Sequence, residues 1–232
     1  MAAKPLRLIA GEPLVRRVAR RVLACEVATE VVVATDHQDV ADAVADLNLT
    51  PVLTDPLHAS GTERAAEVVR RAEFAGREVV LNVQGDEPLI LREALVGALD
   101  QVARGRDVGT AAGPLSRSAR WDVSRVKVSV DGQGRALRFF RSPPAGGCPR
   151  PEAVFHHVGV YAYRPQALQR WTALPPVEEE RTERLEQLRP LLHGMTFGVA
   201  LVQESPPPGV DTAGDLEVME RLFTAAGPGM RG

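Results

Sequence analysis

The chain has 232 residues, which is enough for one sizeable hydrophobic core and a small appended lobe. Its 28 basic and 30 acidic side chains leave a formal charge of −2, which argues against nucleic-acid or anionic-membrane binding as the main task. No apolar run reaches the ~18 residues that a membrane span needs. The N-terminal residues lack an apolar signal core, and the two cysteines lie far apart, as is typical of a reduced protein. We therefore expect a cytoplasmic protein.

In the first half of the chain, short β-branched runs alternate with amphipathic stretches. The spacing of apolar residues predicts helices over 14–25, 40–47, 65–72 and 94–102. Valine-rich runs predict strands over 30–34, 51–53 and 78–83. Strands that alternate with helices of this length predict an α/β fold with a mostly parallel sheet and helices on both faces.

The pattern changes after residue 115. Two short runs flank the turn-forming segment 131–134, which indicates a hairpin over 125–140, and 154–163 predicts one long strand. We expect residues 115–163 to form an antiparallel extension of the sheet, a sub-lobe suited to dimerisation within a single domain over 1–232. The remaining elements predicted are helices over 165–171 and 181–193, a strand over 196–202 and a last helix from 212.

Ligands of an open parallel sheet bind beyond the carboxyl ends of its strands, which directs attention to the residues after strand 78–83. Gly85 lets the backbone approach a ligand closely. Asp86 is suited to hold Mg²⁺, which favours one or two carboxylates together with phosphate oxygens. A plain turn with an acidic residue remains the alternative interpretation at this point.

Two further segments precede predicted helices. Ser60 to Arg64 combines a Gly-containing turn, a helix N-terminus with free N–H groups and a forked guanidinium donor. Asp211 would be a second metal carboxylate facing Asp86. The structural alternatives are an ordinary N-capped helix for the first segment and a residue stabilised by the helix dipole for the second.

Alternation along strand 154–163 places His157, Gly159 and Tyr161 on one face. The candidate ligand-binding pair is therefore His157 with Tyr161, and a sheet-face histidine near a subunit contact is the alternative. The segment 185–189, predicted to be helical, contains Glu186 and Gln187, for which a solvated polar face is the alternative.

In this order and spacing, these segments resemble the 3-deoxy-manno-octulosonate (Kdo) cytidylyltransferase family, also called CMP-Kdo synthetases. The resemblance covers roughly residues 4–222 and is carried by segments 34–37, 60–64, 82–88, 126–128, 157–161, 185–189 and 209–212. It implies a Rossmann-like sheet of the nucleotide-diphospho-sugar transferase type. It also implies a cytoplasmic homodimer that transfers CMP from CTP to Kdo for lipopolysaccharide synthesis, with Mg²⁺ as cofactor.

The resemblance also implies a role for each matching residue. Asp86 and Asp211 would hold Mg²⁺, and Lys4 would act with them in catalysis. The cytidine pocket would be lined by Ser60, Gly61, Thr62, Arg64, Gln84 and Gly85. The sugar acid would be contacted by Arg141, His157, Tyr161, Glu186 and Gln187.

The chain departs from the family pattern in two places. The family opens with an apolar strand and a loop of the form P-A-R-x-x-S-x-R-L-P-x-K-P-L, of which this sequence matches only Lys4, Pro5 and Leu6. Either the start is assigned too late, which we expect because the later motifs are intact, or the chain is an impaired nucleotide-binding relative. Segment 142–148 differs from the family's aromatic-containing loop, which leaves open another acidic sugar, such as 8-amino-Kdo or sialic acid. The match at Glu186 and Gln187 favours Kdo-type sugars.

Overall fold

The computed structural model describes residues 4–116, 118–142, 153–207 and 209–225. The strands are β1 (Leu8–Ile9), β2 (Glu12–Pro13), β3 (Val32–Thr35), β4 (Thr50–Leu53), β5 (Val80–Val83), β6 (Val108–Gly113), β7 (Lys127–Val130), β8 (Ala136–Phe140), β9 (Val154–Tyr163) and β10 (Phe197–Leu201). The helices are α1 (Leu14–Ala24), α2 (Gln38–Asp42), α3 (Gly61–Arg70), α4 (Arg92–Ala103), α5 (Pro165–Ala173), α6 (Glu178–Glu183), α7 (Leu188–Leu192) and α8 (Ala213–Ala225).

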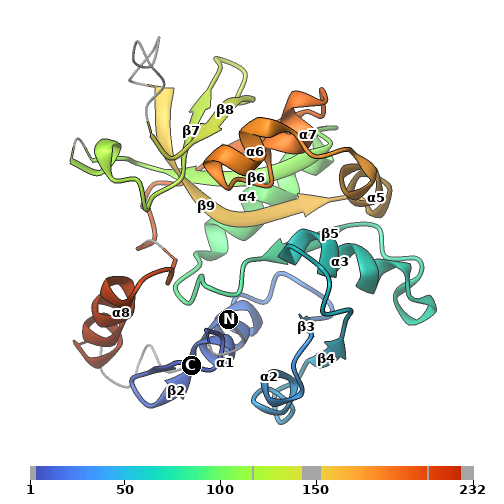
Figure 1. The fold of residues 1–232 in the computed structure, drawn as a ribbon, viewed down its shortest axis with the longest axis vertical. Helices are drawn as coiled ribbons and strands as arrows, with labels where there is room; N and C mark the ends of the chain where they lie inside the picture. The colour runs from blue at the N-terminus through green and yellow to red at the C-terminus, as the bar shows by residue number, and fades with distance from the viewer. Residues whose placement is uncertain (1–3, 117, 143–152, 208, 226–232) are drawn as a thin grey trace.

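The main sheet is mixed and is organised around the long strand β9 (Figure 1). One edge of β9 pairs with β6, and the other pairs with β7 and then β5; all three pairings are antiparallel. β10 lies parallel to β6, and β8 lies antiparallel to β7. Strands β3 and β4 form a separate parallel pair, and among the described residues β3 pairs only with β4 and β5 only with β9.

The expected α/β class is therefore found, but the expectation of a mostly parallel sheet is wrong. Residues 115–163 do form the predicted hairpin, β7 and β8, and the predicted long strand β9. However, β9 lies in the middle of the sheet and does not form an edge extension. A run of apolar residues indicates that a strand is buried, but it does not indicate the direction of its neighbours.

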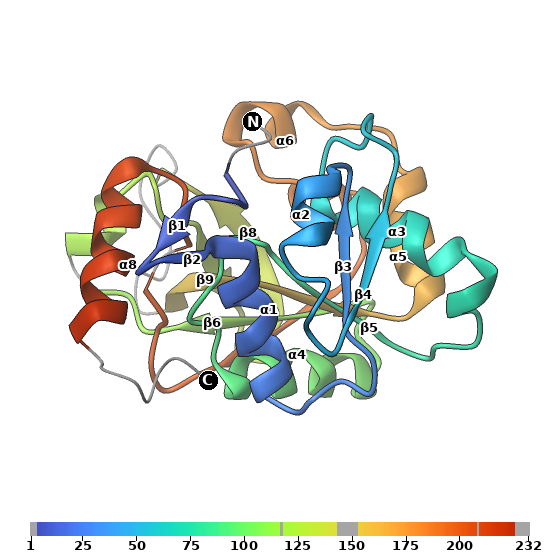
Figure 2. The ribbon, with the colours of Figure 1, turned by 90° about the horizontal axis from the view of Figure 1, so that it is seen from below.

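Two helical layers enclose the main sheet, with α4 on one side and α6 on the other (Figure 2). Alternate residues of β9 enter different cores. Val158 and Val160 pack with residues of α4, whereas Tyr161 and Tyr163 pack in the core that includes Trp171 of α5. The predicted separation of the two faces of β9 is confirmed.

Most predicted elements are present, with two instructive errors. β6 was not predicted because its sequence, VGTAAG, lacks the bulky β-branched pattern of a strand. Gly109 explains this composition, because a Cβ atom there would lie 1.9 Å from the carbonyl oxygen of Ala98 in α4. The predicted helix 181–193 is instead two short helices, because Arg184 adopts a left-handed conformation with φ 54° and ends α6. Residues 185–187 therefore lie in the linker before α7.

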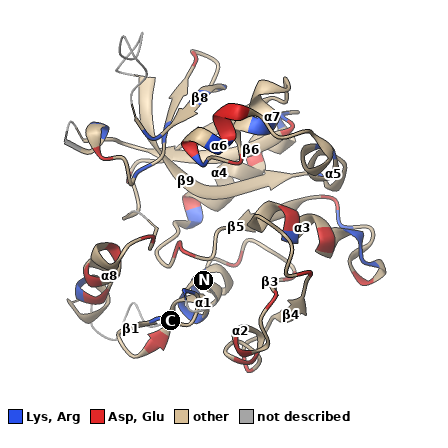
Figure 3. Cartoon of the chain, in the orientation of Figure 1, with Lys and Arg blue, Asp and Glu red and all other residues tan. Residues whose placement is uncertain are grey.

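Lysine, arginine, aspartate and glutamate are spread over all parts of the fold, consistent with the nearly balanced charge (Figure 3). The clearest local excess is on α6, whose first turn contains Glu178, Glu179 and Glu180. In the described part of the chain, no helix has the length and apolar character needed to cross a bilayer.

Candidate functional site

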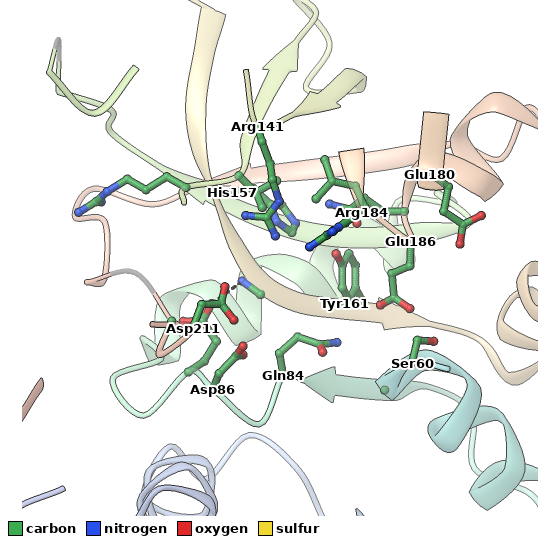
Figure 4. Close-up of a pocket in the computed structure, with 18 of the residues that line it drawn as sticks. Ser60, Gln84, Asp86, Arg141, His157, Tyr161, Glu180, Arg184, Glu186 and Asp211 are labelled. Atoms are coloured by element: carbon green, nitrogen blue, oxygen red, sulfur yellow. Dashed lines mark hydrogen bonds between the residues drawn. The ribbon is translucent and has the colours of Figure 1, made fainter. Parts of the chain in front are cut away.

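A cleft of about 590 Å³ opens where the start of α3, the end of β5, the middle of β9 and the linker 184–187 meet (Figure 4). Ten of the residues predicted from the sequence line it: Ser60, Gly61, Gln84, Asp86, Arg141, His157, Tyr161, Glu186, Gln187 and Asp211. Lys4, Thr62, Arg64 and Gly85 are not among the lining residues. The structure thus brings most of the predicted site together from distant parts of the chain.

Asp86 and Asp211 converge at one end of the cleft. The ammonium group of Lys4 lies 3.0 Å from Asp86 Oδ2 and 2.8 Å from Asp211 Oδ1. The two carboxylates outweigh the effect of burial, which alone would lower the pKa of Lys4, and so raise it. The backbone fixes this arrangement, because the N–H of Val210 donates to the carbonyl oxygen of Asp86 at 2.9 Å. A Cβ on Gly209 would lie 3.2 Å from that same oxygen.

Glu87, next to Asp86, is a buried carboxyl group that sequence reasoning did not assign a role. Its Oε1 accepts the N–H of Gly159 at 3.0 Å, and a Cβ at that glycine would lie 2.6 Å from the same oxygen. Burial, reinforced by the charge of Asp86, raises the pKa of Glu87 to about 8. Glu87 therefore ties the end of β5 to β9 and stays largely protonated at neutral pH. The sequence signal that could have identified Glu87 is its position directly after Asp86, in a pair of adjacent acidic residues at the end of a predicted strand.

The start of α3 has two different environments. Ser60 caps the helix by accepting the N–H of Glu63 at 3.2 Å, and Gly61 lies against Gln84, whose Oε1 would be 3.2 Å from a Cβ there. Thr62 is buried and donates its hydroxyl to Glu186 Oε1 at 2.7 Å. It therefore holds a cleft residue instead of lining the cleft.

Two predicted nucleotide-binding residues lie elsewhere. The guanidinium group of Arg64 forms an ion pair with Asp36 at 2.9 Å and a hydrogen bond to Thr54 at 2.9 Å. It thus joins α3 to the ends of β3 and β4. A Cβ at Gly85 would meet nothing within 4 Å, so this glycine is not required by a close approach within the described chain.

Glu186 is held deep in the cleft wall. Its Oε1 accepts from Thr62, whereas Oε2 is buried without a hydrogen-bond partner among the described residues. Burial raises the pKa of this carboxyl group. An oxygen that is enclosed but unpaired is available to accept a hydrogen bond from a ligand hydroxyl.

His157 is a neutral imidazole of defined tautomer. The hydroxyl of Thr110 donates to the carbonyl oxygen of Val160 at 2.7 Å, so it can only accept from His157 Nε2, which lies 2.9 Å away. Nε2 therefore carries the proton, and Nδ1 is an acceptor. Burial lowers the pKa of His157 to about 3. The ring packs edge-on against Phe139 and lies 5.5 Å from the ring of Tyr161, between centroids.

Besides Arg141, which was predicted, four arginines line the cleft that were not assigned to the site: Arg125, Arg181, Arg184 and Arg189. Arg189 is fixed by Glu180, with hydrogen bonds of 2.8 and 2.6 Å to its two oxygens. The guanidinium group of Arg141 donates to the carbonyl oxygen of Ser124 at 2.9 Å. Arg181 and Arg184 were missed because a continuous helix was predicted over 181–193. Arg189 stands in segment 185–189, which carries the resemblance, but it was given no role. The altered loop at 142–148 falls almost wholly outside the described residues.

The donor set at Asp86 and Asp211 suits Mg²⁺ that is shared with a substrate. Among the described side chains, no group of three or more histidine, cysteine or acidic residues could hold a metal by itself. A cation placed between these two carboxylates would complete its coordination with water or phosphate oxygens, as Mg²⁺ commonly does.

Comparison with known proteins identifies the family of the chain and agrees with its fold. Residues 1–197 match the family model described as cytidylyltransferase. The 3-deoxy-manno-octulosonate cytidylyltransferase of Gemmatimonas aurantiaca is 46% identical over 220 residues, which cover 92% of this chain and 85% of the relative. That of Methylococcus capsulatus is 41% identical over 98% of this chain and 93% of its own length.

Solved structures give the same result. A CMP:2-keto-3-deoxy-manno-octonic acid synthetase complexed with CTP is 34% identical, covers 97% of this chain and 93% of its own, and superposes with a TM-score of 0.85. A putative glucose-1-phosphate thymidylyltransferase from Bacillus anthracis has a TM-score of 0.65 over 94% of this chain and 85% of its own at 13% identity, which shows similarity of fold alone.

Proposed function

The chain belongs to the 3-deoxy-manno-octulosonate cytidylyltransferase family, and from this premise we propose that it transfers CMP from CTP to Kdo. The oxygen of the sugar's anomeric hydroxyl bonds to the α-phosphorus of CTP and gives up its proton to solvent. The bond from that phosphorus to the oxygen that bridges it to the β-phosphorus breaks, and CMP-Kdo and pyrophosphate form. The observation that carries this proposal is the convergence of Asp86 and Asp211, which both line the cleft, on the ammonium group of Lys4. Opposed carboxylates of this kind are expected where a metal-bound triphosphate reacts.

The two carboxylates would hold Mg²⁺ beside the phosphates. Bound there, Mg²⁺ would neutralise phosphate charge and lower the pKa of the attacking hydroxyl. Lys4 supplies a further cation within reach of both carboxylates. The start of α3 offers backbone N–H groups and a positive dipole end to the nucleotide, with Gln84 beside it.

The other part of the cleft is proposed to orient the sugar acid. Arg141 provides a guanidinium group whose fork matches a carboxylate. His157 offers a lone pair at Nδ1, and Glu186 offers the unpaired Oε2 to sugar hydroxyls. Tyr161, whose pKa is raised by burial, remains a neutral phenol. Gln187, which is buried at the cleft wall, completes the proposed sugar-binding set.

We also propose that the protein works as a cytoplasmic homodimer that supplies lipopolysaccharide synthesis. The 115–163 region is the proposed pairing surface, because the exposed apolar residues Trp121, Val123 and Leu137 lie in it. Sedimentation analysis of the intact protein, at the concentrations used in the enzyme assay, tests this pairing. A monomer under these conditions would refute it.

The test of the activity is pyrophosphate release from CTP, Kdo and Mg²⁺. Release is expected from the wild type and should fall at least ~100-fold in Asp86→Asn, because a metal carboxylate contributes several kcal/mol. Pyrophosphate release by the wild type that is no faster than release by Asp86→Asn would refute the proposal. CTP binding by calorimetry without turnover would point to an impaired relative, and competition between Kdo, 8-amino-Kdo and sialic acid would identify the sugar. The family matches favour Kdo turnover over both alternatives.

A further inference from the structure

Arg184 occupies a backbone conformation that favours glycine. It follows α6 with φ 54° and ψ 49°, and the N–H of Leu185 closes the turn on the carbonyl oxygen of Glu180 at 3.1 Å. Helices commonly end in this left-handed conformation, but the residue there is usually Gly or Asn because a Cβ atom is strained. A long charged side chain is thus held at a position where the backbone alone would select a smaller residue.

The side chain of Arg184 is exposed and points into the cavity (Figure 4). Across the described residues it makes no ion pair or hydrogen bond. Two other cleft arginines differ, because Arg189 is paired with Glu180 and Arg125 lies 3.4 Å from a carboxylate oxygen of Asp122. Arg184 therefore offers the cleft an uncommitted guanidinium group, as does the exposed Arg181 within α6, which makes no ion pair or side-chain hydrogen bond among the described residues.

The guanidinium group of Arg141 resembles that of Arg184 in lacking a carboxylate partner within the described chain, although the backbone N–H of Arg141 donates to Glu183 Oε2 at 3.0 Å. Its guanidinium group donates only to backbone carbonyl oxygens, chiefly that of Ser124. Both guanidinium groups face the same cavity in Figure 4. Two like charges directed into one cleft, with neither guanidinium group paired to a carboxylate, favour an anionic ligand there.

We propose that Arg184 is a specificity-determining residue that binds the carboxylate of the acidic sugar together with Arg141. This inference rests on the proposed function and adds a residue to it. A carboxylate has two oxygens with about four acceptor positions and so can receive hydrogen bonds from two guanidinium groups. The sugar is the expected source of that carboxylate, because Arg184 is only two residues from Glu186, whereas the triphosphate is assigned to the end with Asp86 and Asp211.

The position also predicts an unusual combination of effects. If Arg184 only ended α6, replacing it with glycine would relieve backbone strain and leave catalysis unchanged. If it binds the sugar acid, Arg184→Gly should weaken Kdo binding without lowering the melting temperature. Arg184→Lys should recover only part of the loss, because an ammonium group keeps the charge but lacks the planar fork.

The experiment compares the intact wild-type enzyme with Arg184→Gly, Arg184→Lys and the control Arg104→Ala. The control removes an exposed arginine at the C-terminal end of α4, outside the cleft lining and outside the proposed pairing surface. Steady-state kinetics are measured with Kdo and with its uncharged 1-carboxamide, at fixed and at varied CTP. We expect Arg184→Gly to raise the KM for Kdo about tenfold or more, as expected for a lost charge-assisted hydrogen bond, with the KM for CTP unchanged.

The preference for Kdo over the carboxamide should fall by a similar factor in Arg184→Gly and stay at the wild-type value in Arg104→Ala. An unchanged preference for Kdo over the carboxamide in Arg184→Gly overturns the role of Arg184. So does an equal rise in the KM for Kdo and the KM for CTP. Either result leaves the cytidylyltransferase activity established. Absence of wild-type turnover with Kdo overturns both.

Discussion

Replacing His157 with glutamine is expected to make the fold less sensitive to acid. The imidazole is buried on β9 and is neutral, with its pKa lowered to about 3, chiefly by burial. In the unfolded chain the same group titrates near ~6.5. Between these values the unfolded state binds more protons, so the stabilising contribution is complete above pH ~6.5 and is lost as pH falls through the folded pKa.

The size of the effect follows from this interval. Lowering the pH from 8 to 5 should cost the folded state about 2 kcal/mol through His157 alone. Glu87 acts in the opposite sense, because its pKa, raised to about 8, makes folding take up a proton over part of the same range. The informative quantity is therefore the difference between variant and wild type, in which the contribution of Glu87 cancels.

Urea unfolding at pH 8, 7, 6 and 5 measures that difference, with fluorescence of the buried Trp171 as a probe. Glutamine at 157 can still donate to Thr110, so the variant should fold while losing about 2 kcal/mol less than the wild type between pH 8 and 5. His193→Gln removes an exposed imidazole and is the matched control. Equal losses in wild type and His157→Gln would refute the assignment of a neutral buried imidazole.

Three further outcomes are expected. Asp211→Asn should lower kcat about 100-fold or more while the melting temperature stays close to that of the wild type. A variant whose kcat equals that of the wild type would exclude this residue from the proposed metal site. Lys127→Met should cost about 3 kcal/mol or more in urea unfolding, because the buried ammonium group donates to three carbonyl oxygens that would lose their partner; a loss below about 1 kcal/mol would contradict this. Thr62→Val should raise the KM for Kdo and leave that for CTP unchanged, since it removes the hydroxyl that holds Glu186; equal effects on both would show a general distortion of the cleft.

The sequence predicted the elements with strong periodicity and failed where tertiary contacts decide. Valine-rich runs located β3 and β5, and alternation assigned the faces of β9 correctly. Period-two alternation says which side chains share a face, but not which strands become neighbours, so the central position of β9 could not be derived. β6 was missed because its small residues are required by the approach of α4 and not by strand propensity.

For the site, the sequence identified the residues at strand and helix ends better than those in the linker before α7. The convergence of Asp86 and Asp211 depends on a backbone hydrogen bond from Val210, which no local pattern reveals. Arg184 was overlooked because helical periodicity continued through it, and a left-handed arginine cannot be inferred from propensity. The burial of Thr62 behind Glu186 likewise becomes apparent only in three dimensions.

The distribution of charge in the cleft restricts how the two substrates can lie. Asp86 and Asp211 occupy one part of the cavity. Arg141, which follows β8, and Arg184, which follows α6, extend into another part of the same cavity (Figure 4). A sugar carboxylate placed beside the two aspartates would be repelled by them, and a triphosphate placed beside the arginines would lie away from the proposed metal ligands. A neutral sugar would leave two guanidinium charges without a counter-ion. The arrangement we propose avoids both conflicts: it places the triphosphate at the aspartates, the sugar carboxylate at Arg141 and Arg184, and the attacking hydroxyl between them.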